Sequence, residues 1–283
     1  MGNSSQTYPE PLRQALQRAD RVYYATGVLL DADDFGDEQT YHRRQLARAL
    51  AYLHGSGTVA GLAVAWQGAD DTADPPVEEQ LFVQPGLAID RLGRLIELHT
   101  EYCIRLNRWY EQQTAGDLRQ GFSSDLNGVV VDVFIRFAVC ERRKTPAFAA
   151  GGFDALDAVV PSRLRDGYHL SLVIRTEDNL SQNLPVSPWP APNGNIDELH
   201  DAILDAWHEG TDDWDEQGPN PRPEHAEGQD TTDIFLARLT LPAADIGAGE
   251  KPERIENANV IIDNHSRSFV YSTEALARWL GVI

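Results

Sequence analysis

The stretch TGVLLDADDFGDEQTYHRRQLARALAYLHGSGTVAGLAVAWQG, residues 26–68, decides the fold. Asp33 or Asp34 can cap a helix by accepting amide hydrogens of its first turn. A stripe at helical spacing follows, formed by Phe35, His42, Leu46, Ala49, Leu50 and Leu53. Gly55 is well placed for a left-handed C-cap. We therefore predict one amphipathic helix of about 20 residues, roughly 30 Å long, that ends at a glycine hinge.

The segments after this helix have the pattern of antiparallel strands joined by tight turns. Residues 58–66 alternate and are rich in β-branched side chains, and residues 81–98 continue the pattern across turn residues. Gly93 is the expected positive-φ position of a tight reversal. Asp90 and Arg94 flank this turn, so we expect an ion pair across it and an Asp side chain that caps it. This order is typical of a β-meander.

The strongest strand in the sequence is GVVVDVFIRFAV, residues 128–139. Asp132 and Arg136 interrupt it on the same face, because strand side chains alternate with a period of two. Arg163 and Arg165 belong to a later segment of similar character. We expect them to bridge to Asp132 or to acidic loops, which is a structural role.

The composition changes after residue 178. SQNLPVSPWPAPNGN is rich in proline, and an acidic stretch follows an amphipathic helical segment. The apolar face of that helix carries Ile196, Leu199, Ile203, Ala206 and Trp207. The chain ends in STEALARWLGVI, where Ser272 or Thr273 caps a short helix and Leu276 and Leu280 are expected to face inward.

These segments predict an α+β fold that is mainly β. A long N-terminal helix packs on an antiparallel β-meander or sandwich, with a proline-rich acidic insertion. We expect four parts: an N-terminal arm and long helix (1–57), a β-rich core (58–182), the acidic proline-rich insertion with one helix (183–232), and C-terminal strands that return to the core (233–283).

The composition excludes several classes of partner. The formal charge of −20 argues against nucleic acid and against an anionic membrane, because both need clustered Lys and Arg. No stretch approaches 18 consecutive apolar residues, so we expect no insertion into a membrane. Cys103 and Cys140 lie far apart in the sequence; two reduced thiols are the expected state, with one disulfide as the alternative.

Two motifs resemble known ligand-binding sites, but the order or spacing of their residues does not match those sites. The glycines of GSGTVAG follow a helix and precede a strand, which is the reverse of a dinucleotide-binding fingerprint. DADDFGDEQTYH resembles a calcium loop, but His42 stands where a bidentate Glu is required. Glu38 and His42 lie four residues apart on the helix, and we expect a partly buried, hydrogen-bonded His42. We predict no metal and no cofactor.

Ser162, Asp166 and His169 include the residue types of a catalytic triad but fall within one short segment. A triad assembles side chains from separate elements, with the nucleophile on a strained turn. We therefore predict no catalytic residues, and we expect that the protein is not an enzyme.

The order of several segments resembles a family of proteins associated with contractile injection systems and phage tail-like particles. The matching segments are GVLLDADDFGDEQTYHRRQ, LHGSGTVAGLAV, VQPGLAIDRLGRLIEL, PSRLRDGYHLSL and NVIIDNHSRSFVY. The resemblance covers most of residues 22–178 and 233–283. It implies a structural component of such a particle, associated with the baseplate or anchoring a tail fibre, and it implies no catalytic residues.

We therefore expect a non-enzymatic assembly protein, present as a homo-oligomer or in multiple copies among other subunits of a tail-like particle. It would be cytoplasmic at synthesis and then part of a released extracellular or virion-like particle. The alternative is a surface-recognition module for a glycan or cell-envelope partner, and a hydrolase has less support. The residues expected at interaction surfaces are Phe35, Tyr41, Arg44, Arg48, Trp189, Trp207 and Trp214.

Overall fold

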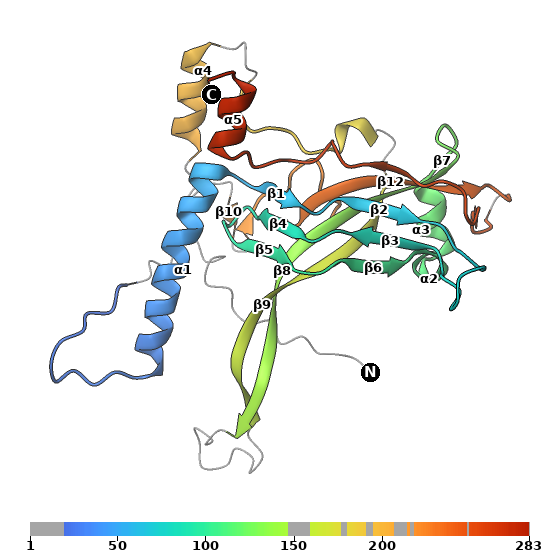
Figure 1. Ribbon diagram of the computed structural model, residues 1–283. Coiled ribbons are helices and arrows are strands. Elements are labelled where there is room, and N and C mark those ends of the chain that lie inside the picture. The colour runs from blue at the N-terminus through green and yellow to red at the C-terminus, as the bar shows by residue number, and fades with distance from the viewer. Residues whose placement is uncertain are drawn as a thin grey trace.

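The structure is a computed structural model. It describes residues 20–146, 159–176, 180–190, 195–206, 214–215, 218–247 and 249–282. It confirms an α+β fold with mainly antiparallel strands and a long N-terminal helix. Figure 1 shows this helix along one side of a β-rich body, from which a two-stranded ribbon projects.

Helix α1 spans Ala32–His54 and begins earlier than the sequence predicts. Its N-cap is Asp31, not Asp33 or Asp34. The Asp31 side chain accepts the amide hydrogens of Asp33 and Asp34, while the Asp34 carboxylate accepts the Asp31 N–H at 2.9 Å. Two residues thus satisfy each other's backbone donors in a capping box. Gly55 ends the helix with a positive φ of 73°, as expected, but its ψ of −161° lies outside the left-handed helical region.

Six short strands follow α1 and form two three-stranded sheets, β1-β4-β5 and β2-β3-β6. The strands are β1 (Gly57–Gly61), β2 (Val64–Gln67), β3 (Gln80–Val83), β4 (Gly86–Ile89), β5 (Leu95–Leu98) and β6 (Tyr102–Arg105). The single strand expected over residues 58–66 is therefore wrong, because the chain breaks at Leu62, which is fully buried at a φ of 55°. At this break the backbone of β1 approaches the start of β4 closely. Glycine at positions 61 and 86 allows the approach, since a Cβ on either residue would lie within 2.3 Å of the opposing backbone.

The turn between β4 and β5 is where α1 meets the body. Gly93 has the expected positive φ of 78°. A Cβ at this position would lie 1.8 Å from the carbonyl oxygen of Ala47 in α1. Only glycine allows the helix backbone this close to the turn.

A six-stranded sheet forms the rest of the body. Its main path is β13-β12-β8-β7, with β14 on β12 and β9 on β8. The strands are β7 (Phe122–Ser123), β8 (Gly128–Pro146), β9 (Val159–Ile174), β12 (Ile234–Ala244), β13 (Glu253–Arg254) and β14 (Ile261–Asp263). Strand β8 is longer than the predicted 128–139, and its pairing with β12 ends at Ile135. Beyond that residue β8 pairs with β9 in the projecting ribbon (Figure 1).

The hydrophobic core lies between this sheet and the two small ones. Its buried members include Leu62, Leu81, Ile96, Val131 and Leu239. Two short helices, α2 (Leu106–Gln112) and α3 (Ala115–Gln120), add to its rim through Leu106, Tyr110 and Leu118. The core is thus formed by the strand segments that the sequence predicts most clearly.

The remaining elements lie outside this core. They are the 3-10 helix η2 (Leu180–Gln182), α4 (Ile196–Asp205), the strand pair β10 (Trp214–Asp215) and β11 (Gly218–Pro219), and α5 (Thr273–Trp279). Ser272 caps α5 by accepting the Ala275 N–H, as the sequence predicts. The end of the expected insertion packs into the body, where Glu224 and His225 are buried.

Candidate docking surface

The buried charged side chains cross-link the body. Asp132 on β8 is fully buried, and Arg238 on β12 donates to its two oxygens at 2.7 and 2.8 Å. Arg175, just after β9, lies 3.5 Å from the same carboxylate. The predicted bridge from Arg163 or Arg165 to Asp132 is therefore wrong. Strand register puts Val173 opposite Asp132, which leaves Arg165 about 26 Å further along the ribbon.

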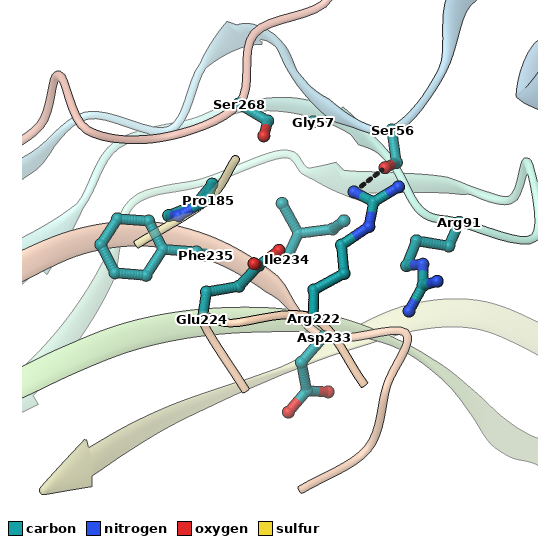
Figure 2. Close-up of a pocket in the computed structure, with 10 residues that line it drawn as sticks. All are labelled: Ser56, Gly57, Arg91, Pro185, Arg222, Glu224, Asp233, Ile234, Phe235 and Ser268. Atoms are coloured by element: carbon teal, nitrogen blue, oxygen red, sulfur yellow. Dashed lines mark hydrogen bonds between the residues drawn. The ribbon is translucent and has the colours of Figure 1, made fainter. Parts of the chain in front are cut away.

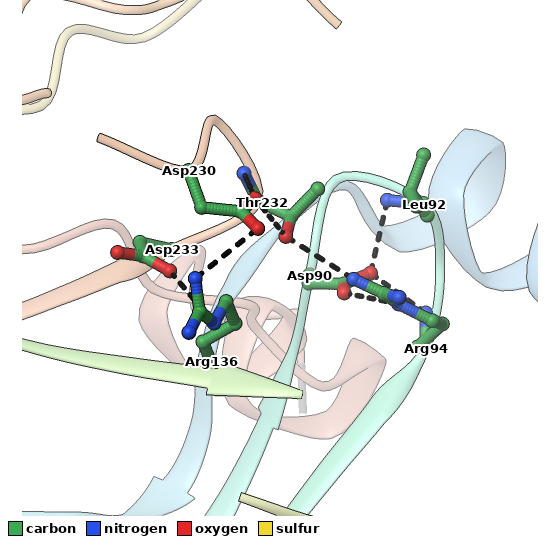
Figure 3. Close-up of polar contacts among 7 residues, drawn as sticks. All are labelled: Asp90, Leu92, Arg94, Arg136, Asp230, Thr232 and Asp233. Atoms are coloured by element: carbon green, nitrogen blue, oxygen red, sulfur yellow. Dashed lines mark hydrogen bonds and ion pairs between the residues drawn. The ribbon is translucent and has the colours of Figure 1, made fainter. Parts of the chain in front are cut away.

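A second polar network joins the small sheets to the large one (Figure 3). Asp90 accepts hydrogen bonds from the backbone N–H groups of Leu92 and Arg94, and from Arg94 Nε at 2.6 Å. This confirms the predicted ion pair and turn cap. Arg94 also donates to Thr232, whose hydroxyl donates to Asp230. The network thus links the β4–β5 turn to the loop before β12 through buried, charge-assisted hydrogen bonds, which helps to fix how the two sheets meet.

A small pocket lies beside this network, lined by Arg222 and Glu224 among others (Figure 2). Arg222 donates to the Ser56 hydroxyl at 3.2 Å. Glu224 Oε2 is buried without a hydrogen-bond partner in the described part of the chain. The enclosed space is only about 10 Å³, roughly that of one water molecule. It does not accommodate an organic substrate.

The residues that resemble a catalytic triad lie along a single strand. Ser162 and His169 are both in β9, so their backbones are about 23 Å apart at the usual rise per residue. The Ser162 hydroxyl donates to the carbonyl oxygen of Arg143 on the facing strand. The geometry does not bring these side chains together as a nucleophile and its base.

Glu38 and His42 are hydrogen-bonded at 2.9 Å, as predicted, but His42 is exposed instead of partly buried. Among the described residues, no group of three or more His, Cys, Asp or Glu side chains is arranged to hold a metal ion. The thiols of Cys103 and Cys140 are free. None of the helices in the described segments combines the length and apolar composition needed to cross a membrane.

Helix α1 leaves its apolar stripe outside the body. Ala47 is its buried residue within the described chain, whereas Phe35, Leu46 and Leu53 are 54%, 57% and 77% exposed. At about 100° per residue, these three lie on one side of the helix, about 100° to 120° from Ala47. The predicted stripe is present, and the helix packs on the β4–β5 turn through its Ala47 side, so the stripe faces away from the body. The close backbone contact at Gly93 directs the Ala47 side to the body.

Helices α4 and α5 have similar exposed apolar faces. Ile203 and Leu204 on α4 are 55% and 75% exposed, and Trp279 on α5 is 89% exposed. Leu276 and Leu280 are also exposed, so the prediction that they face inward is wrong. In the view of Figure 1, α4 and α5 lie beyond the edge of the body. Pairing of Phe269 with Thr58 at the start of β1 puts α5 at this edge.

We name the exposed apolar side chains of these three helices the outer helical surface. Its members are Phe35, Leu46, Leu53, Ile203, Leu204, Trp279 and Leu280. These side chains belong to three separate helices, and apolar helix faces of this kind dock into grooves on partner proteins. The helical periodicity reveals these faces, but the sequence does not tell which side of each helix the body covers.

The other predicted interaction residues differ in their exposure and in how much of them the structure describes. Tyr41, Arg44 and Arg48 are half-buried, and both arginines already have interactions within the chain. Trp189 is 47% exposed. Trp214 is in β10 but its side chain is not described, and Trp207 lies outside the described residues. Of the seven predicted residues, Phe35 is the member of the outer helical surface.

Neither the family models nor the curated proteins include a match to this sequence. Among solved structures, one similar chain comes from "The baseplate complex from the type VI secretion system". The two chains share 12% identity with a TM-score of 0.35, over 94% of this chain and 64% of that one. This chain thus spans less than two thirds of that protein's length, and a TM-score of this size does not establish a shared fold.

Proposed function

We propose that this chain is a non-enzymatic structural subunit of a contractile injection system or phage tail-like particle. In this role it docks to other subunits through the outer helical surface. Following the sequence resemblance, we propose a place in the baseplate or at the anchor of a tail fibre. The chain is then made in the cytoplasm and incorporated into the particle.

The exposure of the α1 stripe is the observation that carries this proposal. A helix of 23 residues that buries little against its own chain gains little stability from tertiary packing. Burying one Leu or Phe side chain against a partner contributes about 1.5–3 kcal/mol. Phe35, Leu46 and Leu53 present such side chains along one line, which fits a groove or a second helix on a partner.

Particles purified from cells that carry or lack this gene test the proposal. Mass spectrometry and electron microscopy of wild-type particles are expected to detect the chain, and particles from the deletion strain are expected to lose neighbouring components. Unchanged composition in the deletion strain, with no copy of the chain in wild-type particles, would contradict the proposal.

A pair of variants then tests the surface. Leu46→Glu with Leu53→Glu places two charges in the apolar stripe and is expected to remove the chain from particles, because the binding contribution of two leucines is lost. Gln39→Glu with Gln45→Glu adds the same charge at exposed polar positions of the same helix. Equal incorporation of both variants would exclude the stripe as the docking surface.

Recognition of a glycan or cell-envelope partner is the alternative proposal. Trp189 is half exposed, and aromatic rings provide apolar faces with defined stacking geometry. Trp189→Ala is expected to abolish glycan-array binding if this alternative holds. The absence of any glycan-array signal for the wild-type chain would exclude glycan recognition.

A further inference from the structure

The outer half of the β8–β9 ribbon carries a cluster of arginines in an otherwise acidic protein. Arg142 and Arg163 are directly opposite each other in the register, and Arg165 lies two residues from Arg163 on the same face. Arg143 lies next to Arg142 with a positive φ of 52°. All four side chains are exposed. We name Arg142, Arg143, Arg163 and Arg165 the ribbon arginines.

The ribbon arginines are unfavourable for the isolated chain. Like charges directly opposite each other destabilise an antiparallel strand pair. A left-handed backbone conformation adds strain for a residue other than glycine, and such strain is concentrated at functional sites. Within the described residues, none of the four arginines forms an ion pair, although the protein has 44 acidic side chains. A partner that supplies carboxylates would relieve this repulsion.

The space beside these side chains fits acidic side chains of another protein. A hollow of about 240 Å³ is lined by the ribbon arginines and Leu164. This is below the usual range for a drug-sized ligand, about 300–1,000 Å³. Arginine forks bind carboxylates through two parallel hydrogen bonds. Leu164 is 53% exposed at the same place, so an apolar side chain of the partner would also be accommodated.

The first turns of α1 have the complementary chemistry. Asp33 and Asp37 are exposed there, and Phe35 between them is 54% exposed. Asp31 and Asp34 cap the helix and remain engaged with it. Asp33 and Asp37 lie one turn apart on the same face of the helix, and neither carboxylate has a partner among the described residues, so this pair matches the opposed arginines of the ribbon. In the view of Figure 1, the start of α1 and the ribbon extend from the body in the same direction.

We propose that the ribbon arginines of one copy of this protein bind the acidic start of α1 in a second copy. The chain has a net charge of −20, so copies repel each other at long range, and local positive charge on the ribbon would offset this repulsion where two copies meet. The same net charge opposes a long polyanion such as nucleic acid. This contact rests on the proposed assembly role and adds one specific partner to it, a second copy of the chain. Its test requires only the purified protein.

A charge-swap experiment tests this contact in solution. Sedimentation of the full-length chain up to about 0.1 mM is expected to show self-association, weaker as the salt rises from about 50 to 500 mM. Arg142→Glu with Arg163→Glu, and separately Asp33→Arg with Asp37→Arg, are each expected to weaken it by at least about tenfold. Mixing the two variants is expected to restore association, because each copy then meets its opposite charge.

Three results would each overturn the proposed contact. The wild-type chain could stay monomeric at all concentrations, either variant could self-associate as strongly as the wild-type chain, or mixing the two variants could fail to restore association. Circular dichroism and thermal unfolding of each variant confirm that both fold. Binding of a DNA oligonucleotide by the wild-type chain but not by Arg142→Glu/Arg163→Glu, without self-association, would reassign the ribbon arginines to a polyanion. A wild-type chain that stays monomeric in solution but is incorporated normally into particles would refute this contact and leave the proposed function intact.

Discussion

The body and the outer elements of this protein use charged and apolar side chains in opposite ways. In the body, Asp90, Asp132 and Glu79 are buried, and each is bonded to an arginine. In the outer elements, leucines of α1 and arginines of the β8–β9 ribbon are exposed. The body therefore pairs these buried carboxylates within the chain, whereas the outer elements expose groups that a partner would cover or pair in the proposed role. Four changes test this contrast, from the largest expected effect to the smallest.

The largest effect is expected for Asp132→Ala, which removes the carboxylate shared by Arg175 and Arg238. Both guanidinium groups would stay in the body without their charge partner, and breaking a buried pair in this way costs about 3–5 kcal/mol. Urea denaturation measures the free energy of unfolding. Asp125→Ala, at an exposed position before the same strand, is the control. A loss below about 1 kcal/mol for Asp132→Ala would contradict the role of this network.

Gly93→Ala is expected to destabilise the protein by about 2–4 kcal/mol. Its Cβ would overlap the Ala47 carbonyl oxygen, and its φ of 78° is strained for alanine. Gly228→Ala is a matched control, because Gly228 has a φ of 74° with nothing within 4 Å of its Cβ. The difference in unfolding free energy between the two variants measures the contact between α1 and the body. Equal losses would mean that this contact is absent.

Acid is expected to weaken the body through His225. Burial lowers the pKa of this imidazole, and its Nδ1 accepts the Arg222 backbone N–H, which requires an unprotonated nitrogen. The unfolded state then binds more protons, so the contribution of His225 is present above pH 6.5 and is lost as the pH falls below it. The slope is at most about 1.4 kcal/mol per pH unit.

Unfolding free energies measured between pH 7.5 and about 5 for the wild-type chain and His225→Asn test this effect. Asn can keep an acceptor near the Arg222 N–H without titrating, so the variant is expected to show a smaller slope. The pKa of His169 is also lowered, by burial and by Arg136, so some slope is expected to remain. Identical slopes for both chains would contradict the prediction.

The smallest effect is expected for Leu46→Glu with Leu53→Glu in the purified chain. Both side chains are already mostly exposed, so the unfolding free energy is expected to change by less than about 0.5 kcal/mol. Thermal denaturation at a fixed protein concentration measures it. A loss above about 1 kcal/mol would show that the free chain covers the stripe.

The same contrast separates what the sequence could predict from what it could not. The turn at Gly93, the Asp90–Arg94 pair and the Ser272 cap were predictable because each depends on residues only a few positions apart. The partners of Asp132 were not, because they depend on the register of three strands. A one-residue shift of any strand would turn its side chains to the other face.

The candidate docking surface was predictable in part. Helical spacing identified the apolar stripe of α1, including Phe35. The side that faces the body depends on the approach of Ala47 to Gly93, which lies 46 residues further along the chain. Likewise, α5 was recognisable from its cap, but its exposure depends on the pairing of Phe269 with Thr58. Distant contacts of this kind leave no local signal.

Hydroxyl-radical footprinting of the free chain and of the chain within purified particles tests the central claim most directly. We expect strong labelling of Leu46, Leu53 and Trp279 in the free chain and protection of these side chains in the particle. The buried Leu239 is expected to stay unlabelled in both. Equal labelling of the outer helical surface in the two states would contradict the claim that it docks to other subunits.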